Sequence, residues 1–202
     1  MEVKRILIAS VGGQGGLTLA RVIAEVAVLS GLSVRTGETL GMAQRYGSVV
    51  SYVQIGSRVY TPKFLPGEAD YLIGLELVET LRNIHYLSSR GVAIVADEYR
   101  PPYTMSFENP KATRNDLIAR LKSILPSAMI IPARKIAVEA GNPRALNIVL
   151  LGAFNSIAGL FDQNVVYEAI KRVLPRKAVD TSIKAYDMGY AVAESLKHSI
   201  PI

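Results

Sequence analysis

The sequence predicts a single α/β domain over residues 1–202, built in three layers around a mixed, mostly parallel sheet and ending in a helical C-terminal third. Three observations support this fold class. Apolar runs typical of buried strands alternate with helical patterns, a pair of strand-like runs joined by a short turn interrupts them, and only helical periodicity follows. A chain of 202 residues is also the right size for one domain with a substantial core.

A strand, a helix and a second strand are expected at the start of the chain. The apolar run KRILIA, residues 4–9, is typical of a buried strand. A mostly buried helix is predicted over Gly16–Leu29, because its polar residues share one stripe. These polar residues are Thr18, Arg21 and Glu25. Gly31 ends the helix as a C′ glycine, and LSVRT at 32–36 is predicted to be the second strand.

The middle of the chain is expected to supply the rest of the sheet. SVVSYVQI at 48–55 and RVYTP at 58–62, separated by Gly-Ser, predict an antiparallel hairpin. Further buried strands are expected at 70–76, 91–97 and 127–133. Helices are expected at about 76–89 and at about 115–125. Three prolines within residues 98–113 predict an irregular excursion there.

The C-terminal third is expected to consist of helices. Asn142 and Pro143 suit an N-cap and the first position of a helix. The helical segment from Arg144 is apolar nearly all round, which predicts burial in a large core or under a partner, and we expect the isolated chain to form a homodimer. A later helix pairs Glu168 with Arg172, four residues apart. One face of the last helix is expected to carry Val179, Ile183, Tyr186, Tyr190 and Ala193.

Composition excludes several classes of site within this chain. There is no cysteine, so structural disulfides, thiolate-bound iron–sulfur clusters, Cys-type zinc sites and a Cys nucleophile are excluded. Two histidines make a self-contained His-rich metal site an unfavourable interpretation. The start of the chain shows no signal-like apolar region, and the longest apolar run is too short to span a bilayer, so we expect a soluble, cytoplasmic protein without membrane contacts.

The net charge of +6 and the pI near 9.5 raise the question of nucleic acid. Lysine and arginine are spread along the chain, and no basic stripe is interleaved with aromatic residues. We therefore expect no nucleic-acid partner. Anionic small ligands or an acidic protein partner fit the charge at least as well.

The first candidate site is the glycine loop between the first strand and the first helix. It comprises Gly12, Gly13, Gln14, Gly15 and Gly16. Backbone N–H groups of such a loop, together with the helix N-terminus behind it, favour phosphate. The dinucleotide fingerprint is matched only in part, because Ser10 takes the position of its first glycine and no acidic residue ends the second strand. Arg35 leaves NADP open, the Walker pattern is not matched, and a tight turn without a ligand is the alternative.

The second candidate site lies in GETLGMAQRYGSVVSYVQIG, residues 37–56. Its residues of interest are Gln44, Arg45, Tyr46 and Gly47. In a β-α-β arrangement this loop leaves from the same carboxyl edge of the sheet as the glycine loop, which is the usual ligand crevice. The alternative is a solvated turn with an ordinary surface arginine.

Taken together, SVGGQG, GMAQRYGSVVSYVQIG, PGEADYLIGLE and NIVLLGAF resemble one family in the right order along almost the whole chain. They resemble the gamma subunit, or gamma domain, of 2-oxoacid:ferredoxin oxidoreductases. The GETLGMAQRYGSVVS segment is most similar to the small beta subunit of indolepyruvate:ferredoxin oxidoreductase. Two positions depart from the family pattern, Ser10 and Tyr46, where the family often has glycine.

The resemblance implies a subunit of a multisubunit enzyme that is inactive alone. Such an enzyme converts a 2-oxoacid, here an aryl pyruvate such as indolepyruvate, and coenzyme A to an acyl-CoA and carbon dioxide, and it reduces ferredoxin. It further implies that thiamine diphosphate and the iron–sulfur clusters are held by a larger catalytic subunit, through which ferredoxin is reached. This chain would complete the active-site wall and help to admit coenzyme A, with no catalytic residue, metal or tightly held cofactor of its own.

Two other interpretations remain open at this stage. A freestanding NAD(P)- or nucleotide-binding protein is favoured only by the generic loop. A non-catalytic regulatory or scaffold relative would use the same fold without the chemistry. Asn147 is likewise open, since it is either a satisfied buried amide or a contact to a partner subunit.

Overall fold

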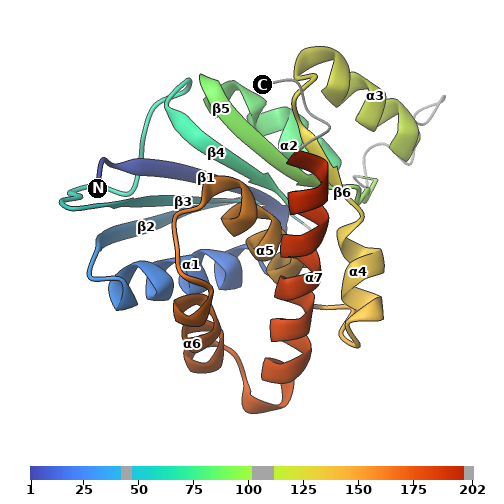
Figure 1. Cartoon of the computed structure of the whole chain (residues 1–202). Coiled ribbons are helices and arrows are strands. Elements are labelled where there is room, and N and C mark those ends of the chain that lie inside the picture. The colour runs from blue at the N-terminus through green and yellow to red at the C-terminus, as the bar shows by residue number, and fades with distance from the viewer. Residues whose placement is uncertain (42–46, 102–111, 198–202) are drawn as a thin grey trace.

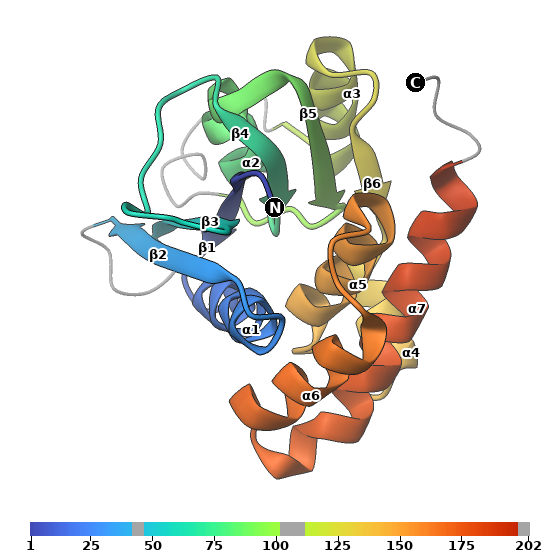
Figure 2. The same cartoon turned by 60° about the vertical axis from the view of Figure 1, so that its left-hand side comes forward.

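The computed structural model describes residues 1–41, 47–101 and 112–197. They form a single α/β domain in which a six-stranded sheet lies between two layers of helices (Figures 1 and 2). This three-layer arrangement confirms the fold class predicted from the sequence. None of the helices within the described ranges combines the length and the apolarity needed to cross a bilayer.

The sheet is mixed and mostly parallel, as predicted. Its strands are β1 (Lys4–Val11), β2 (Ser33–Leu40), β3 (Ser48–Gly56), β4 (Ala69–Gly74), β5 (Leu87–Ala96) and β6 (Met129–Ile131), in the order β2-β3-β1-β4-β5-β6. β1, β4, β5 and β6 pair in parallel, whereas β3 runs antiparallel to both β1 and β2. The side chains of Ile6 to Ala9 in β1 are fully buried, because this central strand is covered on both faces.

The helices are α1 (Gly16–Leu29), α2 (Leu77–Asn83), α3 (Arg114–Ile124), α4 (Ala133–Glu139), α5 (Leu146–Ala158), α6 (Gln163–Val173) and α7 (Val179–Lys197). α1 and α4–α7 pack on one face of the sheet, and α2 and α3 pack on the other (Figure 2). α1 has the predicted bounds, and Gly31 follows it with a φ of 71°. α3 begins where Thr113 and Asp116 form a reciprocal capping box.

The predicted hairpin of residues 48–55 with 58–62 is wrong. β3 forms as expected, but its two edges are taken by β1 and β2, so no edge is left for residues 58–62. That segment is a loop in which Val59 is buried, and Phe64, just after it, is buried in the apolar cluster against one face of the sheet. The Phe64 ring meets the ring of Tyr52 edge-on, with 5.4 Å between the centroids.

Two helix boundaries also differ from the predictions. The helix expected at 76–89 ends at Asn83, and a short 3-10 turn at Ile84–Tyr86 leads into β5. The hydroxyl of Tyr52 donates a hydrogen bond of 3.2 Å to that of Tyr86, which holds this turn against the sheet. The Asn142–Pro143 pair does not cap α5. Instead, the Asn142 side chain accepts from the backbone N–H of Arg144 within a turn, and the helix begins at Leu146.

The apolar circumference of α5 is covered by the chain itself. α5 packs against α1, α4, α7 and β5, and Figure 1 shows it between the sheet and α7. A Cβ added at Gly152 or Gly189 would collide with the backbone of the facing helix, so these glycines allow α5 and α7 to approach closely. The homodimer was expected because this helix would need a partner to cover its apolar surface. Since the chain itself covers that surface, the homodimer stays a prediction that this helix no longer supports.

Candidate functional site

The strand ends converge beside the glycine loop, as the sequence predicted. Val11, the last residue of β1, pairs with Ser48, the first residue of β3, and Leu40 at the end of β2 pairs with Val49. The end of β4 lies at the same edge, where Gly74 pairs with Ala9. This is the carboxyl edge of the parallel strands, where ligands bind in open α/β sheets.

The glycine loop connects β1 to α1 through two left-handed residues. Gly13 has a φ of 92° and Gly15 a φ of 87°, a region that side chains other than glycine rarely adopt. A Cβ at Gly15 would lie 2.6 Å from the side-chain nitrogen of Asn147. A Cβ at Gly16 would collide with the hydroxyl of Ser10. Gly15 and Gly16 are thus required for packing, whereas Gly13 has open space around it.

Gln14 braces this loop from within. Its side chain is almost fully buried, and its Oε1 accepts a hydrogen bond of 2.8 Å from the backbone N–H of Val11. Its Nε2 donates to the carbonyl oxygen of Leu75 at 3.2 Å, just beyond the end of β4. These bonds join the loop to the end of β4, so the Gln14 amide stabilises the conformation of the loop itself.

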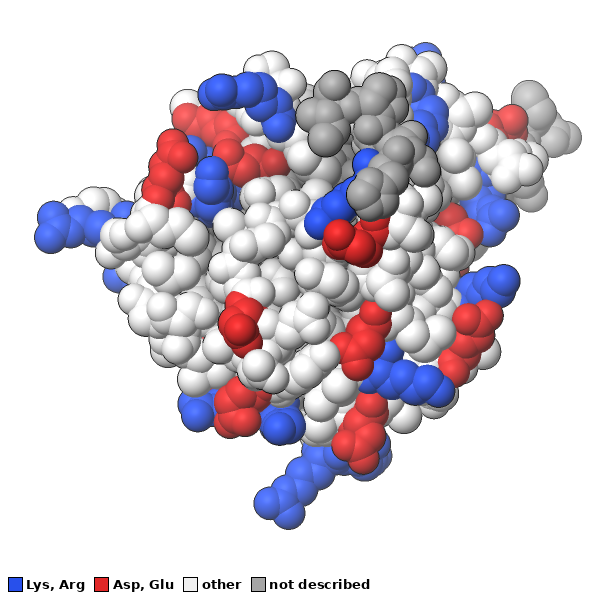
Figure 3. Space-filling view, viewed as in Figure 1, with Lys and Arg blue, Asp and Glu red and all other residues white. Residues whose placement is uncertain are grey.

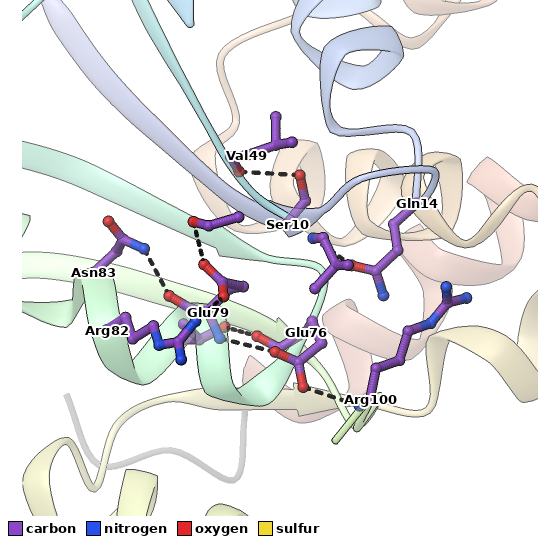
Figure 4. Close-up of polar contacts among 11 residues, drawn as sticks. Ser10, Gln14, Val49, Glu76, Glu79, Arg82, Asn83 and Arg100 are labelled. Carbon is purple, nitrogen blue, oxygen red and sulfur yellow. Dashed lines mark hydrogen bonds and ion pairs between the residues drawn. The ribbon is translucent and has the colours of Figure 1, made fainter. Parts of the chain in front are cut away.

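Ser10, near the end of β1, has a structural role. Its hydroxyl donates a hydrogen bond of 3.2 Å to the carbonyl oxygen of Val49 (Figure 4). The side chain also fills the space directly beside Gly16. Serine therefore joins β1 to β3 at the base of the loop.

Gln44, Arg45 and Tyr46 of the second candidate site lie outside the described residues. The residues that flank them are described. The carbonyl oxygen of Gly47 accepts a hydrogen bond of 2.8 Å from the backbone N–H of Gly12, and Gly41 donates to the carbonyl oxygen of Ser48 at 2.9 Å. The second segment thus leaves and re-enters the sheet next to the glycine loop.

Two buried carboxylates stand beneath this edge (Figure 4). Glu79 accepts hydrogen bonds of 2.5 Å from the hydroxyl of Ser48 and of 2.6 Å from the guanidinium of Arg82. Glu76 is fully buried and accepts from the backbone N–H groups of Glu79 at 2.8 Å and Arg100 at 3.1 Å. Burial raises the pKa of the Glu76 carboxyl, and these backbone hydrogen bonds oppose that rise.

A cleft of about 690 Å³ opens on one side of the glycine loop. Its walls are the loop, the first turns of α1, the turn before α5 and the α6–α7 connection. The cationic side chains in its lining are Arg21, Arg100, Arg134, Arg144 and Lys177. The described residues place no Asp or Glu in this lining.

Most of the charge in this cleft is uncompensated. Arg134 forms an ion pair with Glu98, but the other four cations make no ion pair with another described residue. Four neighbouring positive charges without carboxylates favour a ligand that carries several negative charges. By contrast, positive and negative side chains are interspersed on the face of the molecule in Figure 3, which shows no single basic stripe.

Sequence reasoning found one wall of this cleft and missed the others. Gly13, Gln14 and Gly15 were predicted, and Thr18 and Arg21 belong to the polar stripe recognised on α1. Arg100, Arg144 and Lys177 come from three later segments, and no local motif marks them.

A smaller hollow of about 310 Å³ on the strand side of the loop is lined by Gly12, Gly16 and Val49 among others.

The described residues around the cleft were expected to hold no metal ion of their own, and their side chains define what the site can do. The described ranges contain no group of three His, Cys, Asp or Glu side chains placed to hold a metal ion. Among the described residues, no nucleophilic side chain lies next to a general base in the lining of the cleft. The lining side chains supply cations, hydroxyls and amides. The site is therefore suited to binding an anion rather than to acid–base chemistry.

The chain is similar to known proteins over nearly its whole length. A family model described as pyruvate ferredoxin/flavodoxin oxidoreductase matches residues 5–192. The indolepyruvate oxidoreductase subunit IorB of Pyrococcus horikoshii is 36% identical over 199 residues, which is 97% of this chain and 98% of that protein.

Two solved structures share the fold. The gamma subunit of a keto/oxoacid ferredoxin oxidoreductase from Geobacter sulfurreducens matches with a TM-score of 0.73 at 22% identity, over 95% of this chain and 99% of that one. The 2-oxoglutarate:ferredoxin oxidoreductase of Magnetococcus marinus, solved with 2-oxoglutarate, coenzyme A and succinyl-CoA, matches with a TM-score of 0.74 at 19% identity. That match covers 100% of this chain and 33% of the Magnetococcus chain.

Proposed function

Because the chain belongs to the pyruvate ferredoxin/flavodoxin oxidoreductase family and is a subunit of a 2-oxoacid:ferredoxin oxidoreductase, we propose that its enzyme oxidises an aryl pyruvate such as indolepyruvate. The reaction takes the 2-oxoacid and coenzyme A to an acyl-CoA and carbon dioxide. The two electrons released go to ferredoxin. The IorB name of relatives at 30 to 37% identity supports the choice of an aryl pyruvate.

The observation that carries this proposal is the cationic cleft beside the glycine loop. Coenzyme A has a diphosphate and a separate ribose phosphate, so its nucleotide end presents several negative charges. Arg21, Arg100, Arg144 and Lys177 offer matching positive charges around a volume of about 690 Å³. The backbone N–H groups at the start of α1 add a favourable dipole for one phosphate. In this proposal the chain binds and orients coenzyme A.

The remaining chemistry is assigned to a larger partner subunit. Without cysteine this chain cannot ligate an iron–sulfur cluster through thiolates. Thiamine diphosphate, when bound by the partner, supplies the carbanion chemistry that no side chain provides. Gln44, Arg45, Tyr46 and Gly47 would then face the partner at the carboxyl edge of the sheet and complete the wall of its active site.

A freestanding NAD(P)-binding protein is the alternative, and the strand order counts against it. In the dinucleotide arrangement the strand that follows the first helix lies next to the first strand and presents an acid to the ribose. Here β3 separates β2 from β1, and β2 forms the outer edge of the sheet. Arg35 on β2 donates to its own neighbour, the carbonyl oxygen of Val34.

Reconstitution tests the proposal. The purified chain alone should be folded, colourless and unable to reduce ferredoxin or viologen with any 2-oxoacid. With its larger partner it should support reduction that depends on coenzyme A, faster with indolepyruvate or phenylpyruvate than with pyruvate or 2-oxoglutarate. Reduction by the chain alone, or a complex that needs no coenzyme A, would contradict the proposal.

A further inference from the structure

Glu76 is a buried carboxylate with more contacts than helix capping requires. It follows β4 directly and is the N-cap of α2, where it accepts a hydrogen bond from the backbone N–H of Glu79 at 2.8 Å. A short polar side chain at this position would serve that role at a lower desolvation cost, because a fully buried charge is expensive. The second oxygen of Glu76 accepts from the backbone N–H of Arg100 at 3.1 Å, which lies 24 residues further along the chain.

A second bond fixes the segment that carries Arg100. The backbone N–H of Leu77 donates to the carbonyl oxygen of Glu98 at 2.9 Å. The start of α2 and the chain leaving β5 are thus joined by one backbone bond and by one bond through the Glu76 side chain. The side chain of Arg100 itself lines the cleft and forms no ion pair with a described residue.

The same short stretch also holds the glycine loop in place. Leu75, the residue before Glu76, accepts the hydrogen bond from the side chain of Gln14 in the glycine loop. Figure 4 shows Gln14, Glu76 and Arg100 close together at this point. Residues 75–76 therefore connect the glycine loop to the segment bearing Arg100.

We propose that Glu76 is a positioning residue whose buried carboxylate fixes the backbone of Arg100 and so holds the Arg100 guanidinium at the cleft wall, ready to contact a phosphate of the ligand. This inference rests on the proposed function for the identity of that ligand, coenzyme A. It goes beyond the proposed function by assigning to Glu76, a residue outside the cleft, the placement of Arg100, one of the four cleft cations that form no ion pair with a described residue.

The test separates capping from positioning. Glu76→Asp keeps the charge and the capping ability but is one methylene too short to bond both Glu79 and Arg100. In the full chain without ligand, the Arg100 amide should exchange its hydrogen at least about tenfold faster than in the wild type. Glu76→Ser, a second short N-cap, should do the same if the aspartate variant does not fold. Unchanged exchange at Arg100 in a folded variant overturns the proposal.

Binding of coenzyme A to the full chain, measured by calorimetry, gives the second readout. We expect Glu76→Asp to weaken binding by about five- to tenfold in the wild type and in Arg144→Ala, but by less than about twofold in Arg100→Ala. An equal loss in all three backgrounds would mean a general structural effect and overturn the proposal. If the wild-type chain and its reconstituted complex bind no coenzyme A, the proposed function fails, and amide exchange still decides the role of Glu76.

Discussion

The side-chain amide of Asn147 donates a hydrogen bond of 3.0 Å to the backbone carbonyl oxygen of Gly15, 132 residues earlier in the chain. Its own oxygen accepts from the backbone N–H of Ile148 at 3.0 Å. Of the two interpretations that the sequence left open, the satisfied buried amide is therefore the one confirmed. Asn147 anchors the glycine loop to the first turn of α5, on the wall of the cleft.

This contact predicts different costs for two glycines of the same loop. Gly15→Ala should lower the free energy of unfolding by about 2–4 kcal/mol, because the new methyl adds a collision with Asn147 to a left-handed backbone. Gly13→Ala should cost only about 1–2 kcal/mol, since its backbone is also left-handed but the space is open. Urea unfolding of both variants measures the difference. Equal costs would show that Asn147 moves aside freely.

The same geometry decides which glycine variant can test phosphate binding at the loop. Gly15→Val would block the approach of a phosphate, but it would not leave the helix core intact. With Asn147 2.6 Å from the new Cβ, valine would disturb α5 as well, so it cannot separate binding from stability. Gly13→Ala is the better variant for binding, because nothing lies within 4 Å of its Cβ position.

Local signals account for what the sequence predicted well. The bounds of α1 and its terminal Gly31 follow from a polar stripe and a glycine within a few residues of each other. The polar contact of Glu168 with Arg172 likewise depends only on helical spacing, and the two side chains lie 3.0 Å apart. Such features need no knowledge of the rest of the fold.

Long-range pairing accounts for what was missed. The hairpin prediction failed because β3 inserts between β1 and β2, which no local pattern indicates. The cleft was missed for the same reason. Arg21, Arg100, Arg144 and Lys177 become neighbours only when four separate segments meet at one edge of the sheet, and each looks like an ordinary surface cation in the sequence.

Removing one cation from the cleft should weaken binding of coenzyme A. Arg144→Ala deletes an exposed positive charge at the turn before α5, and we expect a three- to tenfold weaker affinity, about 0.7–1.4 kcal/mol. Added salt should reduce the wild-type affinity more than that of the variant, because screening acts on the charge that was removed. Calorimetry of the full chain at two salt concentrations measures both effects.

Arg120→Ala provides the matched control for this change. Arg120 is also exposed but lies on α3, on the opposite face of the sheet and away from the cleft. Its removal changes the net charge by the same amount, so the control should bind coenzyme A like the wild type. Equal losses in Arg144→Ala and Arg120→Ala would indicate a general charge effect instead of a site.

Alkaline stability should depend on a buried phenol in the helical layer. Burial raises the pKa of Tyr186 to about 12, and its hydroxyl oxygen accepts a hydrogen bond of 2.8 Å from the side chain of Asn155. Because the folded pKa exceeds the ordinary value of about 10, the unfolded chain loses this proton first. The stabilising contribution is complete below about pH 10 and is lost as the pH rises toward 12.

Urea unfolding between pH 9 and pH 12 checks this expectation. Tyr186→Phe should lower stability at neutral pH by about 1 kcal/mol through the lost hydrogen bond, but its stability should fall less between pH 10 and pH 12. Tyr60→Phe is the control, since this side chain is 78% exposed, and it should follow the wild type throughout. An identical alkaline decline in all three proteins would rule out Tyr186 as its source.

The most direct test of the second loop is Arg45→Ala in the reconstituted complex. The flanking residues Gly41, Gly47 and Ser48 place both ends of this segment beside the glycine loop. A guanidinium there can bind a phosphate or carboxylate through its planar fork, and its loss removes a charge-assisted contact worth roughly 1.5–3 kcal/mol. If that contact acts in the transition state, the rate should fall by about one to two decades.

Stability and a matched arginine distinguish this role from a solvated turn. The unfolding free energy should change little, because a loop arginine contributes little to the core. Arg35→Ala removes an exposed arginine from the outer strand β2, where its guanidinium donates to the neighbouring carbonyl oxygen of Val34, and it should keep the wild-type rate. Measuring both variants at saturating and limiting coenzyme A shows whether the loss lies in the rate or in the affinity. Wild-type values for Arg45→Ala at both concentrations would remove the Gln44–Arg45 segment from the proposed site, while the cationic cleft would stand on its own binding data.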